Sequence, residues 1–240
     1  EIARAACPGQ FVIVIPDEKG ERVPINLADW DGDRGTIDLI FLNLGVSTRK
    51  LARFKAGNSI QAVVGPLGRP AEIGNFGQVL LVGGCYGLAG LYPLAKEFKQ
   101  AGNKVTFLVE GRDEAFIFWE DREKKISDSY QKVLRADCFA SGDDLRKIIS
   151  QLKNSSPDLS RVVVMGCSYL LFIVSKITRE LNLKTMVNLN PIMVDGTGMC
   201  GACRVTVNGQ TYFACVDGPE FDGHGVDWTE YFNRRKAFLR

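Results

Sequence analysis

The sequence DGTGMCGACRVTVNGQTYFAC, residues 195–215, contains three of the seven cysteines of this chain. Cys200, Cys203 and Cys215 follow the spacing C-x2-C-x11-C. Small residues surround the first two cysteines, and such residues let a backbone curl closely around a bulky inorganic centre. Asn208-Gly209 separates two alternating runs and predicts a two-residue hairpin, which returns the third cysteine to the first two. We therefore expect three sulfur atoms to converge.

Spacing alone leaves three interpretations of this motif open. Plant-type [2Fe–2S] sites have the pattern C-x4-C-x2-C…C, and here both spacings are present with Asp195 at the first position. This pattern indicates an iron–sulfur cluster with an oxygen ligand in place of one thiolate. A zinc site would use the same cysteines with Asp195 or His224 as its fourth ligand. The third interpretation is three reduced structural cysteines in a tight turn.

The composition is that of an ordinary globular protein. The 240 residues, 45% of them hydrophobic, suit one large domain or two modest domains with an appendage. The net charge of +2 indicates neither a nucleic-acid nor a membrane partner, and no apolar run approaches the length of a membrane span. We find no secretory signal. The odd number of cysteines favours a reducing, cytoplasmic location over a disulfide framework.

Residues 1–75 predict a small antiparallel β-barrel or sandwich, because short alternating runs are separated by turn residues. These runs are GQFVIVIP (9–16), ERVPINLADW (21–30), GTIDLIFLNL (35–44) and GNSIQAVVGPLG (57–68). Arg22 and Asn26 can place a cation and a polar side chain beside a phosphate or a flavin edge. The segment GVST (45–48) is a natural phosphate seat at the start of a short helix. Both segments are also compatible with ordinary turns.

Residues 76–190 predict a parallel sheet covered by helices on both faces, because apolar strands alternate with helical patterns. We expect strands at 78–84, 104–111, 131–136, 161–166 and 184–190, helices at 88–100, 143–153 and 169–181, and a helix or lid at 113–126. Ligands of such sheets bind beyond the carboxyl ends of the strands. The glycine-rich turn Gly83-Gly84-Cys85-Tyr86-Gly87 suits a pyrophosphate there, and Arg112 can neutralise it.

The order of these parts resembles a known layout. NPIMVDGTGMCGACRVTV (190–207) and FACVDGPEFDGH (213–224) are similar to the ferredoxin-reductase-like electron-transfer subunits. This family includes the small subunit of NADH-dependent reduced-ferredoxin:NADP oxidoreductase, the sulfide dehydrogenase beta subunit and the electron-transfer subunit of dihydroorotate dehydrogenase. The resemblance implies an FAD-binding antiparallel β-barrel (1–75), a parallel-sheet nucleotide-binding domain (76–190) and a C-terminal [2Fe–2S] hairpin with a tail (191–240).

The resemblance also implies particular ligands. The cluster would be held by Asp195, Cys200, Cys203 and Cys215, and FAD by Pro24, Ile25, Asn26, Phe41, Ser47 and Thr48, beside Arg22 and Gly45. A nucleotide would meet Gly83, Gly84, Gly87 and Arg112. Cys85, Tyr86, Gly90 and Cys167 depart from the family pattern. In the common strand order the first and fourth strands, 78–84 and 161–166, are neighbours, which would place Tyr86 and Tyr169 at the mouth of the site. Because bulky residues at this turn narrow the space for a pyrophosphate, we predict weakened or altered NAD(H) binding. The alternative is that both tyrosines swing out and NADH still binds, with Arg112 on its phosphates.

The implied function is that of an oxidoreductase subunit that is active only in a heteromeric complex. It would pass electrons between FAD, the cluster and a larger iron–sulfur flavoprotein, in an electron-bifurcating complex linked to ferredoxin and NAD(P)H. We assign no catalytic residue. The alternatives are an electron-transfer subunit with a degenerate NAD site in a hydrogenase- or dihydroorotate dehydrogenase-type complex, and a structural wiring or docking subunit. The aromatic and basic tail after residue 228 predicts either a solvated helix or a docking arm.

Overall fold

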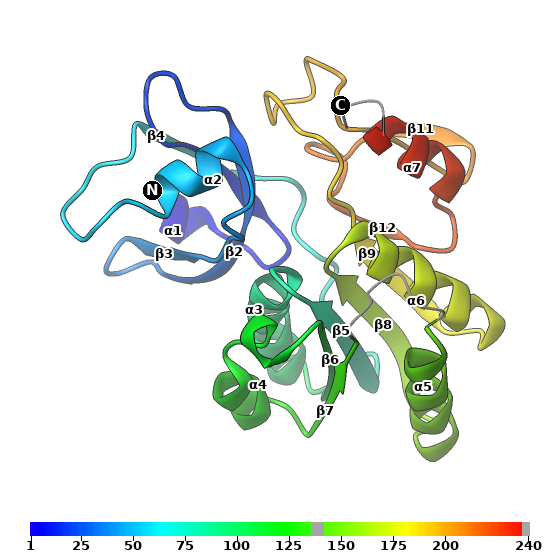
Figure 1. The fold of residues 1–240 in the computed structure, drawn as a ribbon. Helices are drawn as coiled ribbons and strands as arrows, with labels where there is room; N and C mark the ends of the chain where they lie inside the picture. The colour runs from blue at the N-terminus through cyan, green and yellow to red at the C-terminus, as the bar shows by residue number, and fades with distance from the viewer. Residues whose placement is uncertain (136–141, 237–240) are drawn as a thin grey trace.

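A computed structural model describes residues 1–135 and 142–236, which form an antiparallel sheet, a mostly parallel sheet and a hairpin (Figure 1). The last residue of the strand predicted at 131–136 and the last four residues of the tail lie outside the described residues. Within the described ranges, no helix combines the length and the apolar character needed to cross a membrane.

The N-terminal part is an antiparallel sheet with the strand order β3-β2-β1-β4. It contains α1 (Ile2–Ala5), β1 (Phe11–Ile15), β2 (Val23–Asp31), β3 (Thr36–Leu39), α2 (Val46–Leu51) and β4 (Ala62–Leu67). Successive side chains of a strand point to opposite faces. In β1, Val12 and Val14 accordingly enter the core of this domain, whereas Phe11 and Ile13 join the core shared with the rest of the chain.

The central part is a six-stranded sheet with the order β12-β9-β8-β5-β6-β7. Its parallel strands are β5 (Gln78–Gly84), β6 (Lys104–Gly111), β7 (Ser129–Leu134), β8 (Leu159–Met165) and β9 (Lys184–Asn188). The helices are α3 (Gly87–Gln100), α4 (Glu120–Ile126), α5 (Asp143–Ser155) and α6 (Ser168–Glu180), with a 3-10 turn η1 (Glu114–Phe116). The adjacency of β5 and β8, predicted from the common strand order, is confirmed.

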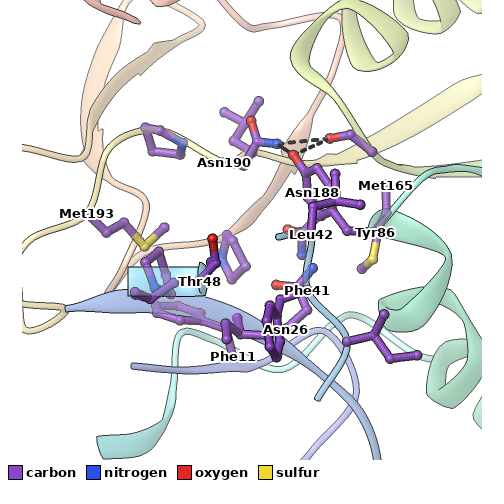
Figure 2. A pocket seen from close by; sticks show the side chains of 18 of the residues that line it. Phe11, Asn26, Phe41, Leu42, Thr48, Tyr86, Met165, Asn188, Asn190 and Met193 are labelled. Atoms are coloured by element: carbon purple, nitrogen blue, oxygen red, sulfur yellow. Dashed lines mark hydrogen bonds between the residues drawn. The ribbon is translucent and has the colours of Figure 1, made fainter. Parts of the chain in front are cut away.

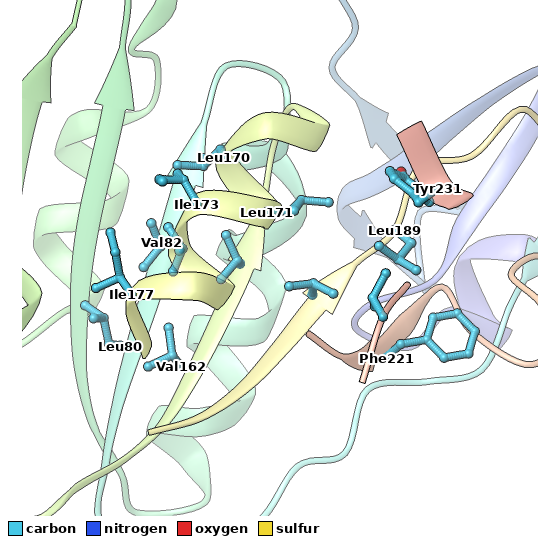
Figure 3. Close-up of a cluster of buried hydrophobic side chains, with 14 of the residues drawn as sticks. Leu80, Val82, Val162, Leu170, Leu171, Ile173, Ile177, Leu189, Phe221 and Tyr231 are labelled. Atoms are coloured by element: carbon cyan, nitrogen blue, oxygen red, sulfur yellow. The ribbon is translucent and has the colours of Figure 1, made fainter. Parts of the chain in front are cut away.

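Both faces of this sheet are buried. On one face Leu80, Val82 and Val162 pack against the apolar side of α6, including Ile177 (Figure 3). The opposite face packs against α3. The helix or lid expected at 113–126 is divided into η1 and α4. The backbone is extended at Ile117, which ends η1, and left-handed at Trp119, with φ 59°, just before α4.

The C-terminal part begins with the predicted hairpin of β10 (Arg204–Val207) and β11 (Gln210–Phe213), whose turn at Asn208 and Gly209 has φ values of 51° and 76°. β12 (Glu220–Asp222) lies in the stretch DGPEFDGHGVDW (217–228), whose turn-rich and acidic sequence predicts no strand, and it pairs antiparallel with β9. The C-terminal part thus shares a sheet with the nucleotide-type part. In α7 (Trp228–Lys236), Trp228 and Phe232 pack against Phe172 of α6, so the aromatic side of the tail docks within the chain.

Candidate functional site

A cavity of about 280 Å³ lies where the three parts of the chain meet (Figure 2). Most of its wall is apolar, and a few amide and hydroxyl groups interrupt it, which is typical of cofactor sites. The lining residues are Phe11, Val23, Pro24, Ile25, Asn26, Ile40, Phe41, Leu42, Leu44, Gly45, Thr48, Tyr86, Met165, Gly166, Asn188, Leu189, Asn190, Pro191, Met193, Pro219 and Arg235. A cavity of this size and character fits the ring system of a flavin.

Six of the eight predicted flavin residues lie on this wall: Pro24, Ile25, Asn26, Phe41, Gly45 and Thr48. The other two point elsewhere. Ser47 is buried and donates a hydrogen bond of 2.9 Å to Glu21, and Arg22 donates one of 3.2 Å to the backbone carbonyl of Asp195. Arg22 therefore connects the β domain to the cysteine-rich loop.

Asn26 contacts the start of α3 at Gly90. A Cβ atom at position 90 would lie 3.2 Å from Asn26 Nδ2 and 2.6 Å from the sulfur of Met165. The glycine thus leaves room for the asparagine amide.

The predicted nucleotide turn is closely packed. Gly83 and Gly84 end β5, and a Cβ at Gly87 would lie only 2.3 Å from the carbonyl carbon of Met165. Arg112 is exposed; its guanidinium lies 3.5 Å from the Asp113 carboxylate and outside the set of cavity-lining residues. The turn therefore lies beside the cavity, whereas the predicted cation does not.

Tyr86 extends from this turn to the cavity wall. Its hydroxyl donates a 3.2 Å hydrogen bond to the carbonyl of Gly166 and accepts one from Asn190 Nδ2 (Figure 2). Burial raises the pKa of the Tyr86 phenol above its ordinary value, so the group stays neutral and keeps its proton for this bond. As predicted, Tyr86 lies at the mouth of the cavity between β5 and β8, whereas Tyr169 lies outside the set of cavity-lining residues and packs against Phe172 of α6.

The structure brings the cysteines together in part. The sulfur atoms of Cys203 and Cys215 are 3.3 Å apart and both residues are buried, whereas Cys200 is exposed. The Asp195 carboxylate accepts hydrogen bonds from the backbone amides of Thr197, at 3.0 Å, and Cys200, at 2.8 Å. These two bonds lower the pKa of Asp195 and keep it charged. The four residues thus form two pairs of candidate metal ligands. Cys203 and Cys215 form the buried pair, and Asp195 and Cys200 form the pair at the surface.

The arrangement in pairs is compatible with a two-iron cluster. In the described part of the chain, no three His, Cys, Asp or Glu side chains form a group that could hold a single metal ion. Each iron of a [2Fe–2S] cluster takes two protein ligands. The candidate zinc ligand His224 instead hydrogen-bonds Thr178, with 3.1 Å between Nε2 and Oγ1.

The loop that carries the donors packs against the β domain. Gly196 has φ +77°, and a Cβ there would lie 2.4 Å from the Cδ1 atom of Ile13 in β1. Burial, with the neighbouring Cys203 thiol, raises the pKa of Cys215 to about 12. A cysteine that binds a metal must be a thiolate, so iron binding would release this proton.

Sequence reasoning missed part of the cavity wall. Met165, Asn188, Asn190, Met193 and Arg235 come from the ends of β8 and β9, from the segment that leads to the cluster loop, and from α7. The rule that ligands bind at the carboxyl edge of a parallel sheet could have found the first three.

An antiparallel β domain and an α/β domain that enclose a flavin-sized cavity, followed by a cysteine-rich hairpin, define an electron-transfer protein of the ferredoxin-reductase-like fold. Residues 190–227 match the iron-sulfur cluster binding domain of dihydroorotate dehydrogenase B. A dihydroorotate dehydrogenase B (NAD(+)) electron transfer subunit homolog of Thermotoga maritima is 44% identical over 97% of this chain and 82% of its own length.

Solved structures of similar fold support the same class of protein. A chain of the NADH-dependent reduced ferredoxin-NADP oxidoreductase, described in work on flavin-based electron bifurcation, matches 99% of this chain and 85% of its own length, with 39% identity and a TM-score of 0.89. A ferredoxin-NADP+ reductase from Plasmodium falciparum matches 73% of this chain and 78% of its own length at 12% identity and a TM-score of 0.61, which shows the fold alone.

This chain belongs to the family of dihydroorotate dehydrogenase B electron transfer subunits and their homologues. The predicted fold and family are confirmed. These findings also support FAD and a [2Fe–2S] cluster as its cofactors.

Proposed function

We propose that this chain is the flavin- and iron–sulfur-carrying subunit of an electron-bifurcating complex of the NADH-dependent reduced ferredoxin:NADP type. Residues 1–75 would hold FAD, residues 76–190 a nucleotide, and residues 191–240 the cluster. In this proposal a larger iron–sulfur flavoprotein completes the complex. The support is the similarity to the solved oxidoreductase chain together with the relation of the cavity to the cluster loop.

The observation that carries the proposal is that β1 serves both sites. Phe11 lines the cavity, and Ile13 packs against Gly196 in the cluster loop. Because residues i and i+2 of a strand are on one face and about 7 Å apart, the two sites are neighbours on a single rigid element. A bound flavin accepts a hydride pair and can release single electrons, and a [2Fe–2S] cluster carries one electron at a time.

The roles of this chain's residues follow from that placement. Asn26 and Thr48 would orient the flavin ring in the otherwise apolar wall. Asp195, Cys200, Cys203 and Cys215 would hold the two irons in pairs, and Gly83, Gly84, Gly87 and Arg112 remain the proposed nucleotide contacts. The Arg22 bond to the Asp195 carbonyl would fix the cluster loop beside the cavity.

The proposal is tested on the complex purified anaerobically under native conditions. We expect a larger iron–sulfur flavoprotein in the complex and, in addition to that partner's own cofactors, one FAD and two irons per copy of this chain. Oxidation of two reduced ferredoxins should require one NADH in the same turnover, reducing two NADP+ with uptake of one proton. FMN, zinc, or a stable monomer that turns over with ferredoxin alone would refute the proposal.

The similarity to the dihydroorotate dehydrogenase B family favours a second candidate, an electron-transfer subunit for a dihydroorotate-oxidising partner. The same purified complex distinguishes the two. Reduction of its flavin by dihydroorotate, and not by NADPH, would select this alternative.

A further inference from the structure

Among the residues that the structure describes on the cavity wall, Arg235 alone is charged. It belongs to α7, outside the β domain that supplies the predicted flavin contacts. Placing a cation in a mostly apolar cavity is costly unless an opposite charge compensates it. The position therefore suits a bound group that is negative, or that becomes negative in use.

Hydrogen bonds and packing hold Arg235 in place. Its Nη1 donates to the backbone carbonyl and to the Oδ1 atom of Asn190, the latter at 3.1 Å. Asn190 Oδ1 also accepts from Tyr231, at 2.8 Å, and from Ser168, at 3.0 Å. Tyr231 is 3% exposed. The guanidinium is thus fixed in advance, which is the condition for an electrostatic effect that needs no reorganisation.

We propose that Arg235 tunes the flavin of this subunit by stabilising its reduced, anionic form. The inference rests on the proposed function, because it requires FAD in the cavity. A hydride brings two electrons and one proton, so the reduced flavin carries one more negative charge than the oxidised flavin. A fixed cation on the wall lowers the energy of that added charge whichever flavin atom bears it. Removing the cation should make the flavin harder to reduce.

A competing role would be contact with the FAD phosphates. These carry the same charge in both oxidation states, so a phosphate contact strengthens binding of oxidised and reduced FAD equally and leaves the midpoint potential unchanged. A redox-tuning cation affects the two affinities differently. The difference between the two affinities, and not the affinity itself, therefore identifies the role of Arg235.

The test uses the intact complex and the variants Arg235→Gln, Arg235→Lys and Lys236→Gln. Lys236 is the neighbouring, exposed cation on the same helix and is absent from the cavity wall, so its variant is matched for lost charge. We expect Arg235→Gln to weaken binding of reduced FAD at least tenfold more than binding of oxidised FAD. For a two-electron couple, tenfold corresponds to a midpoint potential about 30 mV more negative. Arg235→Lys should retain most of the wild-type potential, and Lys236→Gln all of it.

The variant Arg235→His distinguishes redox tuning from phosphate contact even if Arg235→Gln fails to retain FAD. Arg235→His can be loaded at acidic pH, where the imidazole is charged, and then titrated past its ordinary pKa of about 6.5. The potential of this variant should then fall more steeply with pH than that of the wild type. Parallel slopes, or an equal loss of both affinities in Arg235→Gln, would overturn the inference. Wild-type complex without FAD would refute the proposed function itself.

Discussion

Replacing Tyr86 with phenylalanine should open the nucleotide site of this subunit. The hydroxyl makes two hydrogen bonds at the mouth, one to the Gly166 carbonyl at 3.2 Å and one from Asn190 Nδ2. Each such bond contributes about 0.5–1.5 kcal/mol, so displacing the side chain costs about 1–3 kcal/mol. The apparent dissociation constant is the intrinsic one divided by the fraction of molecules in the competent state. With tenfold for each 1.4 kcal/mol, Tyr86→Phe should tighten NADH binding by about 5- to 100-fold.

This substitution leaves no partner unsatisfied, because Asn190 Nδ2 also donates to the Gly166 carbonyl at 2.9 Å. Calorimetry with NADH on the intact complex measures the affinity, and stopped-flow bleaching of the flavin reports on access. Tyr92→Phe is the matched control, since Tyr92 packs against Trp119 away from the cavity. Micromolar NADH affinity in the wild type, unchanged in Tyr86→Phe, would show that Tyr86 does not limit the site.

Three further predictions concern the cluster loop and the α/β domain. Cys203→Ser should lose the cluster, whereas Asp195→Cys should keep it with a shifted potential, because thiolate and carboxylate donate differently to iron; iron analysis and potentiometry check both. Gly196→Ala should reduce iron content and destabilise the loop by about 1–3 kcal/mol, because the added Cβ would overlap a β1 side chain and the backbone is left-handed. Glu123 is fully buried, and burial raises its pKa to about 8 from 4.5. The folded state thus retains a proton that the unfolded state releases above pH 4.5, and stability falls as pH rises from 4.5 to 8. The loss is at most about 4–5 kcal/mol at 1.36 kcal/mol per pH unit; hydrogen exchange in α4 should show it in the wild type and in the exposed control Asp121→Asn, but not in Glu123→Gln.

The sequence predicted the features that local pattern determines. Apolar runs located the parallel strands, and Asn208-Gly209 located the hairpin, because both depend on residues close together in the chain. The adjacency of β5 and β8 followed from a general strand order, which correctly placed Tyr86 at the mouth. β12 was missed because its three residues have no apolar pattern of their own and are held by pairing with β9.

The cavity wall was harder to predict because it is assembled from distant segments. Asn26 and Asn190 both line the cavity but are separated by most of the chain, and no local sequence pattern indicates that they share one site. Arg112 stays a predicted phosphate contact. Its guanidinium lies 3.5 Å from the Asp113 carboxylate and 4.6 Å from the centre of the Phe116 ring, so a nucleotide would have to compete with these local contacts.

Asn190 hydrogen-bonds both Tyr86, at the proposed nucleotide site, and Arg235, at the proposed flavin site, so coupling between the two sites can be tested. Its Nδ2 atom donates to Tyr86 and Gly166, while its Oδ1 atom accepts from Tyr231 and Arg235. A nucleotide that displaces Tyr86 removes a hydrogen-bond partner from the Nδ2 atom of this amide, and its Oδ1 atom helps to fix the position of the Arg235 guanidinium at the cavity wall. Coupling between sites is reciprocal, so reduction of the flavin should change the free energy of NADH binding by the same amount as bound NADH changes the free energy of flavin reduction. Tyr86→Phe and Arg235→Gln should then be non-additive in the double variant, as expected for residues that share one network. Strictly additive effects on the potential would show that the amide holds the two side chains independently.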